Sequence, residues 1–188
     1  MSIILVRHGE TPLNANRTLQ PADTPLSARG LEQAAAVARR LSAAGLAGIL
    51  SSDLPRALQT AQAIAAAAGV PLETTPLLQE RNFGDLRGLP YDSLGYDPIA
   101  REEAPPGGES IASFRARVRD AFDAVIAARA RMGGAVAIVT HGLVIRTIIG
   151  QHAVMPAGAS EPEHVANTSV TVIDASAPYR ITLLNCAR

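Results

Sequence analysis

The stretch IILVRHGET, residues 3–11, decides the fold of this chain. Its first four residues are apolar and mostly β-branched, which is typical of a strand buried on both faces of a parallel sheet. Arg7 and His8 follow directly and therefore lie at the carboxyl end of the strand, the edge at which open α/β sheets bind ligands. An arginine beside a buried strand needs an anion or a carboxylate as its partner. These residues alone fit an anion site and a simple Arg7–Glu10 pair equally well.

A second stretch repeats this arrangement. The apolar run at residues 135–139 ends in Thr140-His141-Gly142, and a helical pattern follows from Leu143. Parallel strands that are separated by helices share one carboxyl edge. The sequence therefore predicts that His8 and His141 face the same crevice.

Two more strand ends add charged side chains to this edge. Residues 46–50 form a short second strand, and Pro55 after it suits the first turn of a helix. Arg56 then lies beside free backbone N–H groups at a helix start, which favours anion binding. Residues 70–78 form a third strand, weakened by its proline, and Glu80 follows it. Alone, Arg56 would be an ordinary exposed arginine, but beside the other residues we expect it in the site.

The remaining segments complete an alternating pattern. Helical patterns run from Ser27 to Gly45 with Leu31 on the apolar face, from Pro55 to Gly69, and from Ser110 to Gly133. Residues 12–26 read as a loop, and residues 86–108 as one irregular excursion that forms a wall or lid. Residues 170–173 and 181–184 form a closing strand pair. This order indicates an α/β fold with a mostly parallel sheet.

Composition narrows the classes of function. The 17 basic and 17 acidic side chains give a net charge of zero, so no global field recruits nucleic acid or a membrane. No apolar run reaches the roughly 18 residues that span a bilayer, and the N-terminus shows no export signal. The single cysteine, Cys186, allows no internal disulfide and fits a reducing compartment. We expect one cytoplasmic domain, residues 1–188.

Six motifs together resemble those of the histidine phosphatase superfamily, which includes cofactor-dependent phosphoglycerate mutases and alpha-ribazole phosphatases. In order they are VRHGET at 6–11 with Asn14, TPLS at 24–27 with Gly30 and 33–34, SSDLPRA at 51–57 with 60–61, ERNFG at 80–84, GGES at 107–110 and VTHG at 139–142. Their order and spacing over nearly the whole chain make the resemblance specific. It implies a three-layer α/β sandwich whose mostly parallel central sheet is flanked by helices.

The resemblance also implies roles for the residues at the sheet edge. His8 would be the nucleophile of a phosphomonoester hydrolase that forms a phosphohistidine, and Glu80 the general acid and base. The phosphoryl group would be bound by Arg7, Asn14, Arg56, His141 and Gly142. His8 must be neutral, with its other ring nitrogen donating to a backbone carbonyl or a similar acceptor. His141 would serve best as a protonated donor.

Three alternatives remain open at this point. His8, Asp53, Glu80 and His141 are also a possible zinc set, but two converging arginines would repel a dication, so we expect no metal and no cofactor. A mutase-type phosphotransferase would need a basic wall, whereas residues 85–103 hold Arg87 and Arg101 against five acidic side chains, which favours hydrolysis. The third alternative is a non-catalytic phospho-ligand binder.

The expected partner is a small-molecule phosphomonoester, with a homodimer possible and neither nucleic acid nor membrane involved. His152 and His164 lie outside any strand end and are interpreted as structural or exposed. The sequence does not specify the substrate, because loops set specificity.

Overall fold

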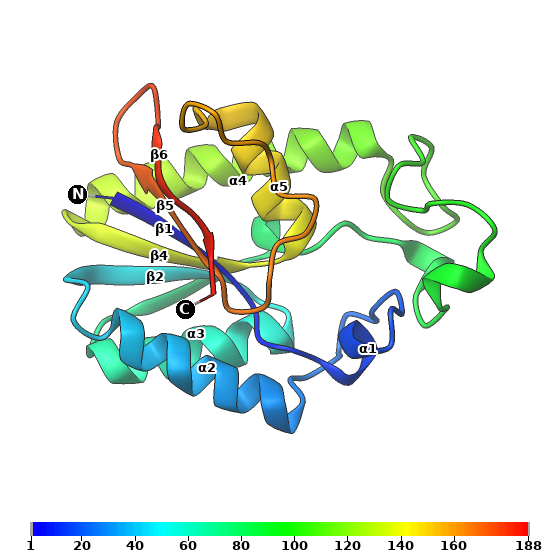
Figure 1. The fold of residues 1–188 in the computed structure, drawn as a ribbon, viewed down its shortest axis with the longest axis horizontal. Helices are drawn as coiled ribbons and strands as arrows, with labels where there is room; N and C mark the ends of the chain where they lie inside the picture. The colour runs from blue at the N-terminus through cyan, green and yellow to red at the C-terminus, as the bar shows by residue number, and fades with distance from the viewer. Residues whose placement is uncertain (1, 188) are drawn as a thin grey trace.

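A central six-stranded sheet organises the computed structural model, which describes residues 2–187 (Figure 1). Its strands are β1 (Ser2–Arg7), β2 (Leu46–Ser52), β3 (Leu72–Thr75), β4 (Ala135–Thr140), β5 (Val170–Asp174) and β6 (Ile181–Cys186). The spatial order is β3-β2-β4-β1-β5-β6; the first four strands are parallel, and β5 and β6 continue the sheet in antiparallel pairs. The expected mostly parallel central sheet is confirmed.

Helices cover both faces of this sheet. They are α1 (Pro12–Ala15), α2 (Ala28–Leu41), α3 (Pro55–Ala68), α4 (Ile111–Met132) and α5 (Gly142–His152), with short 3-10 turns η1 (Pro76–Leu78), η2 (Gly84–Leu86) and η3 (Tyr91–Ser93). Ser27 and Ser110 cap α2 and α4, each hydroxyl accepting a hydrogen bond of 3.0 Å from the N–H three residues on. Gly69 and Gly133 end α3 and α4 in the left-handed conformation.

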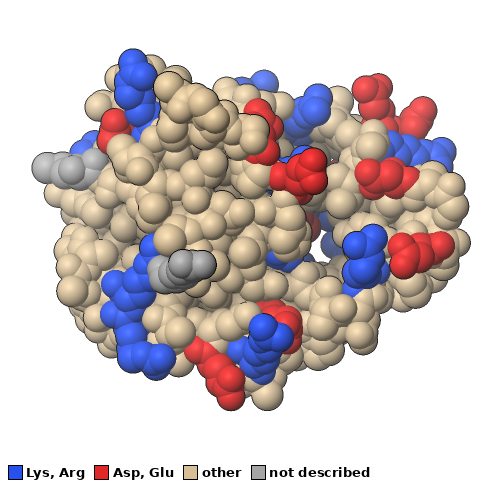
Figure 2. Space-filling model, in the orientation of Figure 1, with Lys and Arg blue, Asp and Glu red and all other residues tan. Residues whose placement is uncertain are grey.

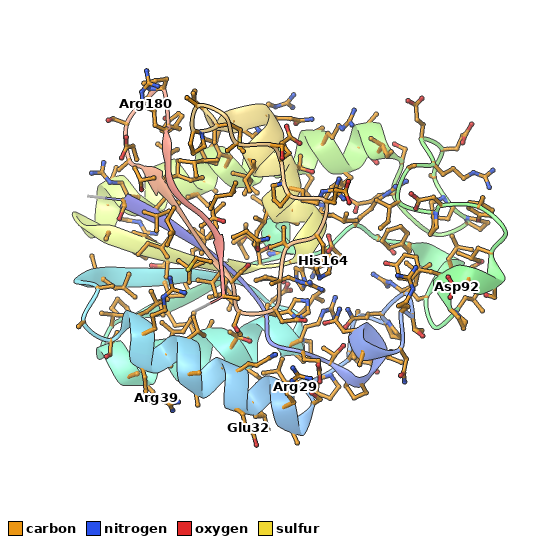
Figure 3. All side chains as sticks on the ribbon, viewed as in Figure 1. Arg29, Glu32, Arg39, Asp92, His164 and Arg180 are labelled. Atoms are coloured by element: carbon orange, nitrogen blue, oxygen red, sulfur yellow. The ribbon has the colours of Figure 1, made fainter. Side chains whose placement is uncertain are left out.

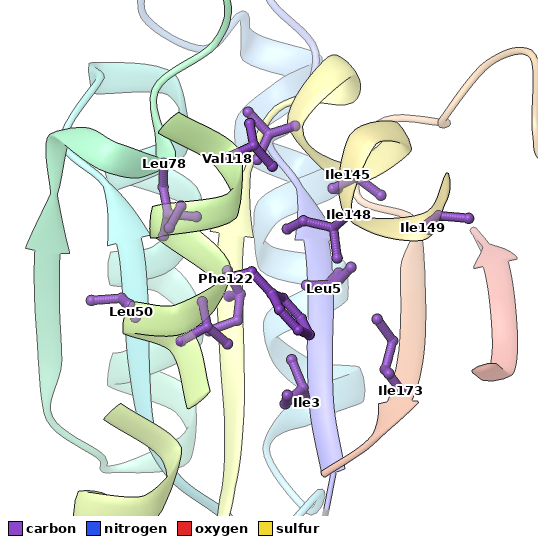
Figure 4. Packing of buried hydrophobic residues seen from close by; sticks show 14 of the residues in the cluster. Ile3, Leu5, Leu50, Leu78, Val118, Phe122, Ile145, Ile148, Ile149 and Ile173 are labelled. Carbon is purple, nitrogen blue, oxygen red and sulfur yellow. The ribbon is translucent and has the colours of Figure 1, made fainter. Parts of the chain in front are cut away.

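Side chains alternate between two hydrophobic cores along the strands. Ile3 and Leu5 of β1 pack with α4 and α5 (Figure 4), whereas Ile4 and Val6 pack with α2 and α3. All four are at most 5% exposed. Because a buried side chain of this size contributes about 1.5–3 kcal/mol, the two cores fix the register of β1, and with it the position of His8.

The register of the parallel strands brings their carboxyl ends to one level. Arg7 pairs with Thr140 in the β1–β4 ladder, and Ser51 pairs with Val139 in the β2–β4 ladder. The next residues along these strands are His8, His141 and Ser52. The sheet edge therefore places their side chains side by side.

Local details differ from the sequence expectations. Residues 12–15 form a short helix within the expected loop, and η1 replaces the end of the expected third strand because Pro76 begins a 3-10 turn. Helix α2 ends at Leu41, before Gly45, and Leu31 is 52% exposed, so it does not belong to the buried face. Among residues 2–187, no helix is long and apolar enough to cross a membrane.

Candidate active site

A cavity of about 390 Å³ opens at the carboxyl edge of the parallel strands. The residues predicted for the site all line it: Arg7, His8, Asn14, Arg56, Glu80, His141 and Gly142. Figure 2 shows its opening, with blue arginine atoms visible in the walls. Its far wall is the excursion after η2, which Figure 1 shows standing away from the sheet.

His8 presents one free ring nitrogen to this cavity. Its Nδ1 lies 2.7 Å from the carbonyl oxygen of Gly9, and its backbone N–H donates to the carbonyl of Thr140 at 3.0 Å. Nδ1 donates its proton to Gly9, as expected from the sequence, so the lone pair lies on Nε2. Burial lowers the pKa of His8 well below its usual value, and the charges of Arg7 and Arg56 act in the same direction. The ring is therefore neutral and suited to nucleophilic attack.

Two arginines flank the His8 ring, and loop carbonyls fix their orientation. Arg7 donates to the carbonyl of Val165, and Arg56 donates to the carbonyls of Pro21 and Ala22 at 3.3 and 3.4 Å. Burial lowers the pKa of both guanidinium groups, that of Arg56 to about 10, and both remain charged near neutral pH. The Nε atoms of both are buried and have no hydrogen-bond partner among residues 2–187.

His141 lies beside His8, with the ring centroids 5.1 Å apart. Its Nε2 is 2.9 Å from the hydroxyl of Ser52, and that oxygen accepts a hydrogen bond from the N–H of Leu54 at 3.3 Å. The Ser52 hydroxyl can donate to Nε2 while its oxygen accepts from Leu54, and in this arrangement the ring proton of His141 lies on Nδ1. This Nδ1 is also buried and without a partner in the described part of the chain.

The expected protonated state of His141 is wrong for the protein as described. Burial lowers its pKa well below the usual value, with the charges of Arg56, His8 and Arg7 adding to the effect. A buried imidazole that faces two guanidinium groups stays neutral. A neutral imidazole still carries one N–H, and when Ser52 donates to Nε2 this N–H is on Nδ1, so the ring is a donor without being a cation.

The carboxylate of Glu80 lines the same cavity as the two histidines. One oxygen accepts from the N–H of Arg81 at 3.0 Å and the other from the N–H of Leu143 at 3.2 Å. Burial raises the pKa of Glu80, although these hydrogen bonds and the charges of Arg56 and Arg7 oppose the shift. A raised pKa suits a group that both gives and takes a proton.

The sequence interpretation missed residues that hold this arrangement in place. Arg117 of α4 donates to the carbonyls of Leu77 and Gln79 at 2.8 Å and of Glu80 at 3.3 Å, and it pairs with Glu109 through two 2.8 Å hydrogen bonds. It therefore fixes the backbone that carries the candidate acid. Nothing in its helical spacing distinguishes it from other surface arginines.

The segment before β5 supplies two further residues. The amide of Asn167 donates to the carbonyl of His8 and to Oδ1 of Asn14, both at 3.0 Å. Nε2 of His164 is 3.3 Å from a terminal nitrogen of Arg7, and the exposed His164 ring lines the cavity, so it lies closer to the site than expected (Figure 3). By contrast, His152 stacks on Phe122, with centroids 4.8 Å apart, and is structural.

The residues considered for a zinc site do not gather. Asp53 is exposed, does not line the cavity, and accepts a hydrogen bond from the side chain of Gln79 at 2.8 Å. Within residues 2–187, no three His, Cys, Asp or Glu side chains lie close enough together to hold a metal ion. The donor set of the cavity is instead guanidinium and imidazole N–H, which suits an oxyanion.

Known proteins resemble this chain over nearly its whole length. A profile of the histidine phosphatase superfamily (branch 1) matches residues 3–186. The probable phosphoglycerate mutase GpmB of Yersinia enterocolitica is 35% identical over 184 residues, which cover 93% of this chain and 85% of that protein.

Solved structures show the same fold. The mycobacterial glucosyl-3-phosphoglycerate phosphatase in complex with VO3 has a TM-score of 0.83 at 27% identity, with 98% of this chain and 99% of that chain covered. The alpha-ribazole phosphatase of Shigella flexneri also has a TM-score of 0.83 at 27% identity, with 100% and 97% covered.

Proposed function

This chain belongs to the histidine phosphatase superfamily (branch 1), and from that premise we propose that it hydrolyses small phosphomonoesters through a phosphohistidine on His8. One observation carries the proposal. Three buried nitrogen atoms, Nε of Arg7, Nε of Arg56 and Nδ1 of His141, have no hydrogen-bond partner among residues 2–187 and belong to side chains that line the cavity with His8. Fixed donors of this kind stabilise the charge on the equatorial oxygens of a phosphoryl group in transit.

The first half-reaction transfers the phosphoryl group to the protein. Nε2 of His8 attacks phosphorus, the bond from phosphorus to the ester oxygen breaks, and the carboxyl group of Glu80 donates its proton to the leaving oxygen. The alcohol departs and phosphohistidine remains. The hydrogen bond from Nδ1 to Gly9 holds the ring in the reactive tautomer throughout.

The second half-reaction releases inorganic phosphate. The carboxylate of Glu80 takes a proton from water, whose oxygen attacks phosphorus, and the bond from phosphorus to Nε2 breaks. His8 returns to its neutral state and Glu80 to its acid form, so the cycle closes. The same donors from Arg7, Arg56 and His141 serve both steps, because the phosphoryl oxygens keep their places while the axial groups exchange.

Trapping the intermediate tests this proposal. We expect p-nitrophenyl phosphate, followed by an alkaline quench, to add one phosphoryl group to the peptide that contains His8, acid-labile and stable to base. The His8→Ala variant should carry no label and release no phosphate above background. His152→Ala is the matched control, because that histidine stacks on Phe122 away from the cavity, and it should keep both label and turnover.

Two outcomes would redirect the assignment. Phosphate release by His8→Ala equal to that of the unaltered protein would remove His8 from the mechanism. Label without phosphate release, together with isomerisation of 3-phosphoglycerate, would favour the mutase-type alternative, which the name of the Yersinia relative supports.

A second part of the proposal concerns the domain organisation of the enzyme and its cellular compartment. We propose that residues 1–188 act as one domain in the cytoplasm. The single cysteine supports a reducing compartment.

A further inference from the structure

A histidine outside the predicted site contacts the arginine that precedes the nucleophile. Nε2 of His164 lies 3.3 Å from Nη1 of Arg7, although the two residues are 157 positions apart in the chain. The His164 ring lines the cavity and is exposed (Figure 3), whereas Arg7 is only 7% exposed. The two half-reactions described above give this ring no part in making or breaking a bond.

The hydrogen bond between the two side chains can run in one direction only. A guanidinium group carries N–H donors and no acceptor, so Nη1 of Arg7 donates and Nε2 of His164 accepts. The accepting nitrogen carries no proton, and the proton of the neutral ring is then on Nδ1. A proton on Nε2, in the other tautomer or in the imidazolium, would place two donors against each other.

This hydrogen bond decides which edge of the Arg7 guanidinium group is left for a ligand. Nη1 has two N–H groups, and the carbonyl oxygen of Val165 accepts from the one that His164 does not use. No hydrogen bond joins Nε or Nη2 of Arg7 to any residue between 2 and 187. These two nitrogens form one edge of the planar group, and such an edge matches two oxygens of a phosphoryl group.

The backbone around His164 is held by the last strand of the sheet. The side-chain amide of Asn185 in β6 donates to the carbonyl of His164 at 2.9 Å, and its Oδ1 accepts from the N–H of Ala166 at 3.0 Å. The N–H of Asn185 donates in turn to the hydroxyl of Thr171 in β5 at 3.0 Å. The ring therefore reaches Arg7 from a fixed segment, and a contact that orients another side chain requires such support.

The charges around the His164 ring favour its neutral form. Burial lowers its pKa, and the cations Arg7 of β1 and Arg146 of α5 act in the same direction, so the ring is neutral near pH 7. The carboxylate of Glu161, on the same segment, lies against α5, where a Cβ on Gly150 would be 2.9 Å from it. The other charged or titratable side chains that line the cavity outside the phosphoryl site are Arg17, Arg81, Arg87, Tyr91, Asp97 and Glu163.

We propose that His164 is a positioning residue for Arg7: as a neutral acceptor it holds Nη1, so that the edge formed by Nε and Nη2 faces the phosphoryl oxygens. Protonation of the ring ends this contact. The exposed imidazolium then turns into solvent, where salt screens its charge, and Arg7 keeps only the carbonyl of Val165. Affinity for the phosphoryl group therefore falls in mildly acidic solution. The inference deepens the proposed function and rests on it for the identity of the bound group.

Two substitutions of His164 separate the loss of the acceptor from the loss of the ring. Glutamine keeps an acceptor oxygen near the place of Nε2 and cannot be protonated in this pH range, whereas alanine removes the acceptor. At about pH 8, kcat/KM for p-nitrophenyl phosphate should be about tenfold lower in His164→Ala and within about threefold of the unaltered protein in His164→Gln, since hydrogen bonds of charged groups have that strength. Equal losses in both variants, or no loss in His164→Ala, would overturn the proposal.

A comparison of pH profiles isolates the titration of His164. The substrate and the other groups of the site titrate in both proteins, so they cancel in the ratio of kcat/KM for His164→Gln to kcat/KM for the unaltered protein. This ratio should rise by about tenfold as pH falls from about 8 through the pKa of His164, because the unaltered protein then behaves like His164→Ala. A ratio that stays constant or falls would overturn the proposal.

His152→Gln is the matched control for these profiles. The pKa of His152 is also lowered by burial, but its ring stacks on Phe122 and does not line the cavity. The ratio of kcat/KM for this variant to that of the unaltered protein should stay constant over the same range. A rise equal to that of His164→Gln would show that loss of either histidine has the same effect, and would overturn the specific role of His164.

Nitrogen NMR of the free protein reads the hydrogen bond directly. At about pH 8 the neutral His164 ring should carry its proton on Nδ1 and leave Nε2 unprotonated, because the donor on Arg7 fixes the tautomer. A proton held on Nε2 would overturn the proposal.

A binding measurement separates this inference from the proposed function. Sulfate is a tetrahedral dianion whose charge is constant between about pH 5 and about pH 8, so its titration by calorimetry needs no turnover. From the higher to the lower pH, the dissociation constant should rise about tenfold more in the unaltered protein than in His164→Gln. If no phosphomonoester is hydrolysed, the proposed function fails while sulfate binding still decides the role of His164. Parallel changes in the two proteins would overturn that role.

Discussion

The hydroxyl of Ser52 lies 2.9 Å from Nε2 of His141, and both side chains are completely buried. The oxygen of Ser52 is already an acceptor for the N–H of Leu54, so its proton is available for the imidazole. A neutral imidazole that accepts at Nε2 carries its proton on Nδ1. We therefore predict that Ser52 acts as a positioning residue that donates to Nε2 and makes His141 a donor toward the cavity.

Removing this hydroxyl tests the tautomer. We expect Ser52→Ala to lower kcat by about tenfold, the worth of one hydrogen bond, with little change in KM. Nitrogen NMR of the free enzyme should show the His141 proton shared between Nδ1 and Nε2 instead of held on Nδ1. Ser51→Ala removes the adjacent buried hydroxyl, which bonds backbone carbonyls only, and should leave the His141 signals unchanged. Unaltered signals in Ser52→Ala would contradict the role.

The raised pKa of Glu80 predicts how the rate depends on pH. The first step needs the acid form, so kcat/KM should fall as pH rises through this pKa. Glu80→Gln should lose that limb of the profile. It should slow hydrolysis of an alkyl phosphate such as glycerol 3-phosphate by about 100-fold or more, but slow phosphohistidine formation from p-nitrophenyl phosphate far less, because nitrophenolate leaves without a proton. Equal losses on both substrates would exclude the acid role.

The raised pKa of Glu80 also predicts that the Glu80→Gln variant is more stable than the unaltered protein at high pH. A carboxyl group whose pKa is higher in the folded protein than in the unfolded chain stabilises the fold below the unfolded value, near 4.5, and that contribution is lost as pH rises through the folded value. Glu80→Gln removes the cost of ionisation, so its free energy of unfolding should exceed that of the unaltered protein at about pH 8 and not at about pH 4. Urea denaturation at the two pH values measures the difference. A variant no more stable at pH 8 would show that Glu80 ionises freely.

The ends of the strands were predictable from the sequence because each strand is a run of apolar residues that is followed directly by polar residues. This signal is local in the chain. The meeting of His8 and His141 followed from parallel pairing, which needs no knowledge of side-chain packing. Gly9 and Gly30 were recognisable only as parts of motifs. The structure supplies the reason: a Cβ on Gly9 would lie 2.5 Å from the carbonyl oxygen of Gly30, and one on Gly30 would lie 2.0 Å from that of Glu10.

Residues that act through distant backbone escaped prediction. The side chain of Arg117 reaches carbonyls 37 to 40 positions away in the chain, and that of Asn167 reaches the His8 carbonyl 159 positions away. Neither has a local pattern, because the partner is a carbonyl that every residue carries. The protonation state of His141 was also beyond reach, since it depends on burial and on charges from other elements.

Arg117 should matter more to stability than a surface arginine with the same ion-pair geometry. Its side chain and that of Glu109 are 19% and 21% exposed, whereas the Arg131–Glu73 pair, also at 2.8 Å, is 59% and 42% exposed. We expect Arg117→Met to cost about 2–3 kcal/mol, because partly buried carbonyls lose their donors, and Arg131→Met to cost less than about 1 kcal/mol. Chemical denaturation measures both, and equal costs would contradict the anchoring role of Arg117.

Asn167 and Asn14 should act on the reaction as a pair. Because Oδ1 of Asn14 accepts from Asn167, the amide nitrogen of Asn14 remains as a donor for a phosphoryl oxygen in the cavity. We expect Asn14→Ala to lower kcat/KM by about 10- to 100-fold, and Asn14→Asp to lower it further, since a carboxylate keeps the acceptor but repels phosphate.

The double variant decides how Asn167 acts. If Asn167 works by orienting Asn14, the losses in Asn14→Ala and Asn167→Ala will not add, and the double variant will resemble Asn14→Ala. If it works instead through its 3.0 Å hydrogen bond to the His8 carbonyl, the free-energy losses will add, because the two variants then disturb different groups. Steady-state kcat/KM for the four proteins measures the coupling. We expect non-additivity, since the His8 backbone is also held by its N–H bond to Thr140, whereas the only side-chain hydrogen bond of Asn14 within residues 2–187 is the one to Asn167.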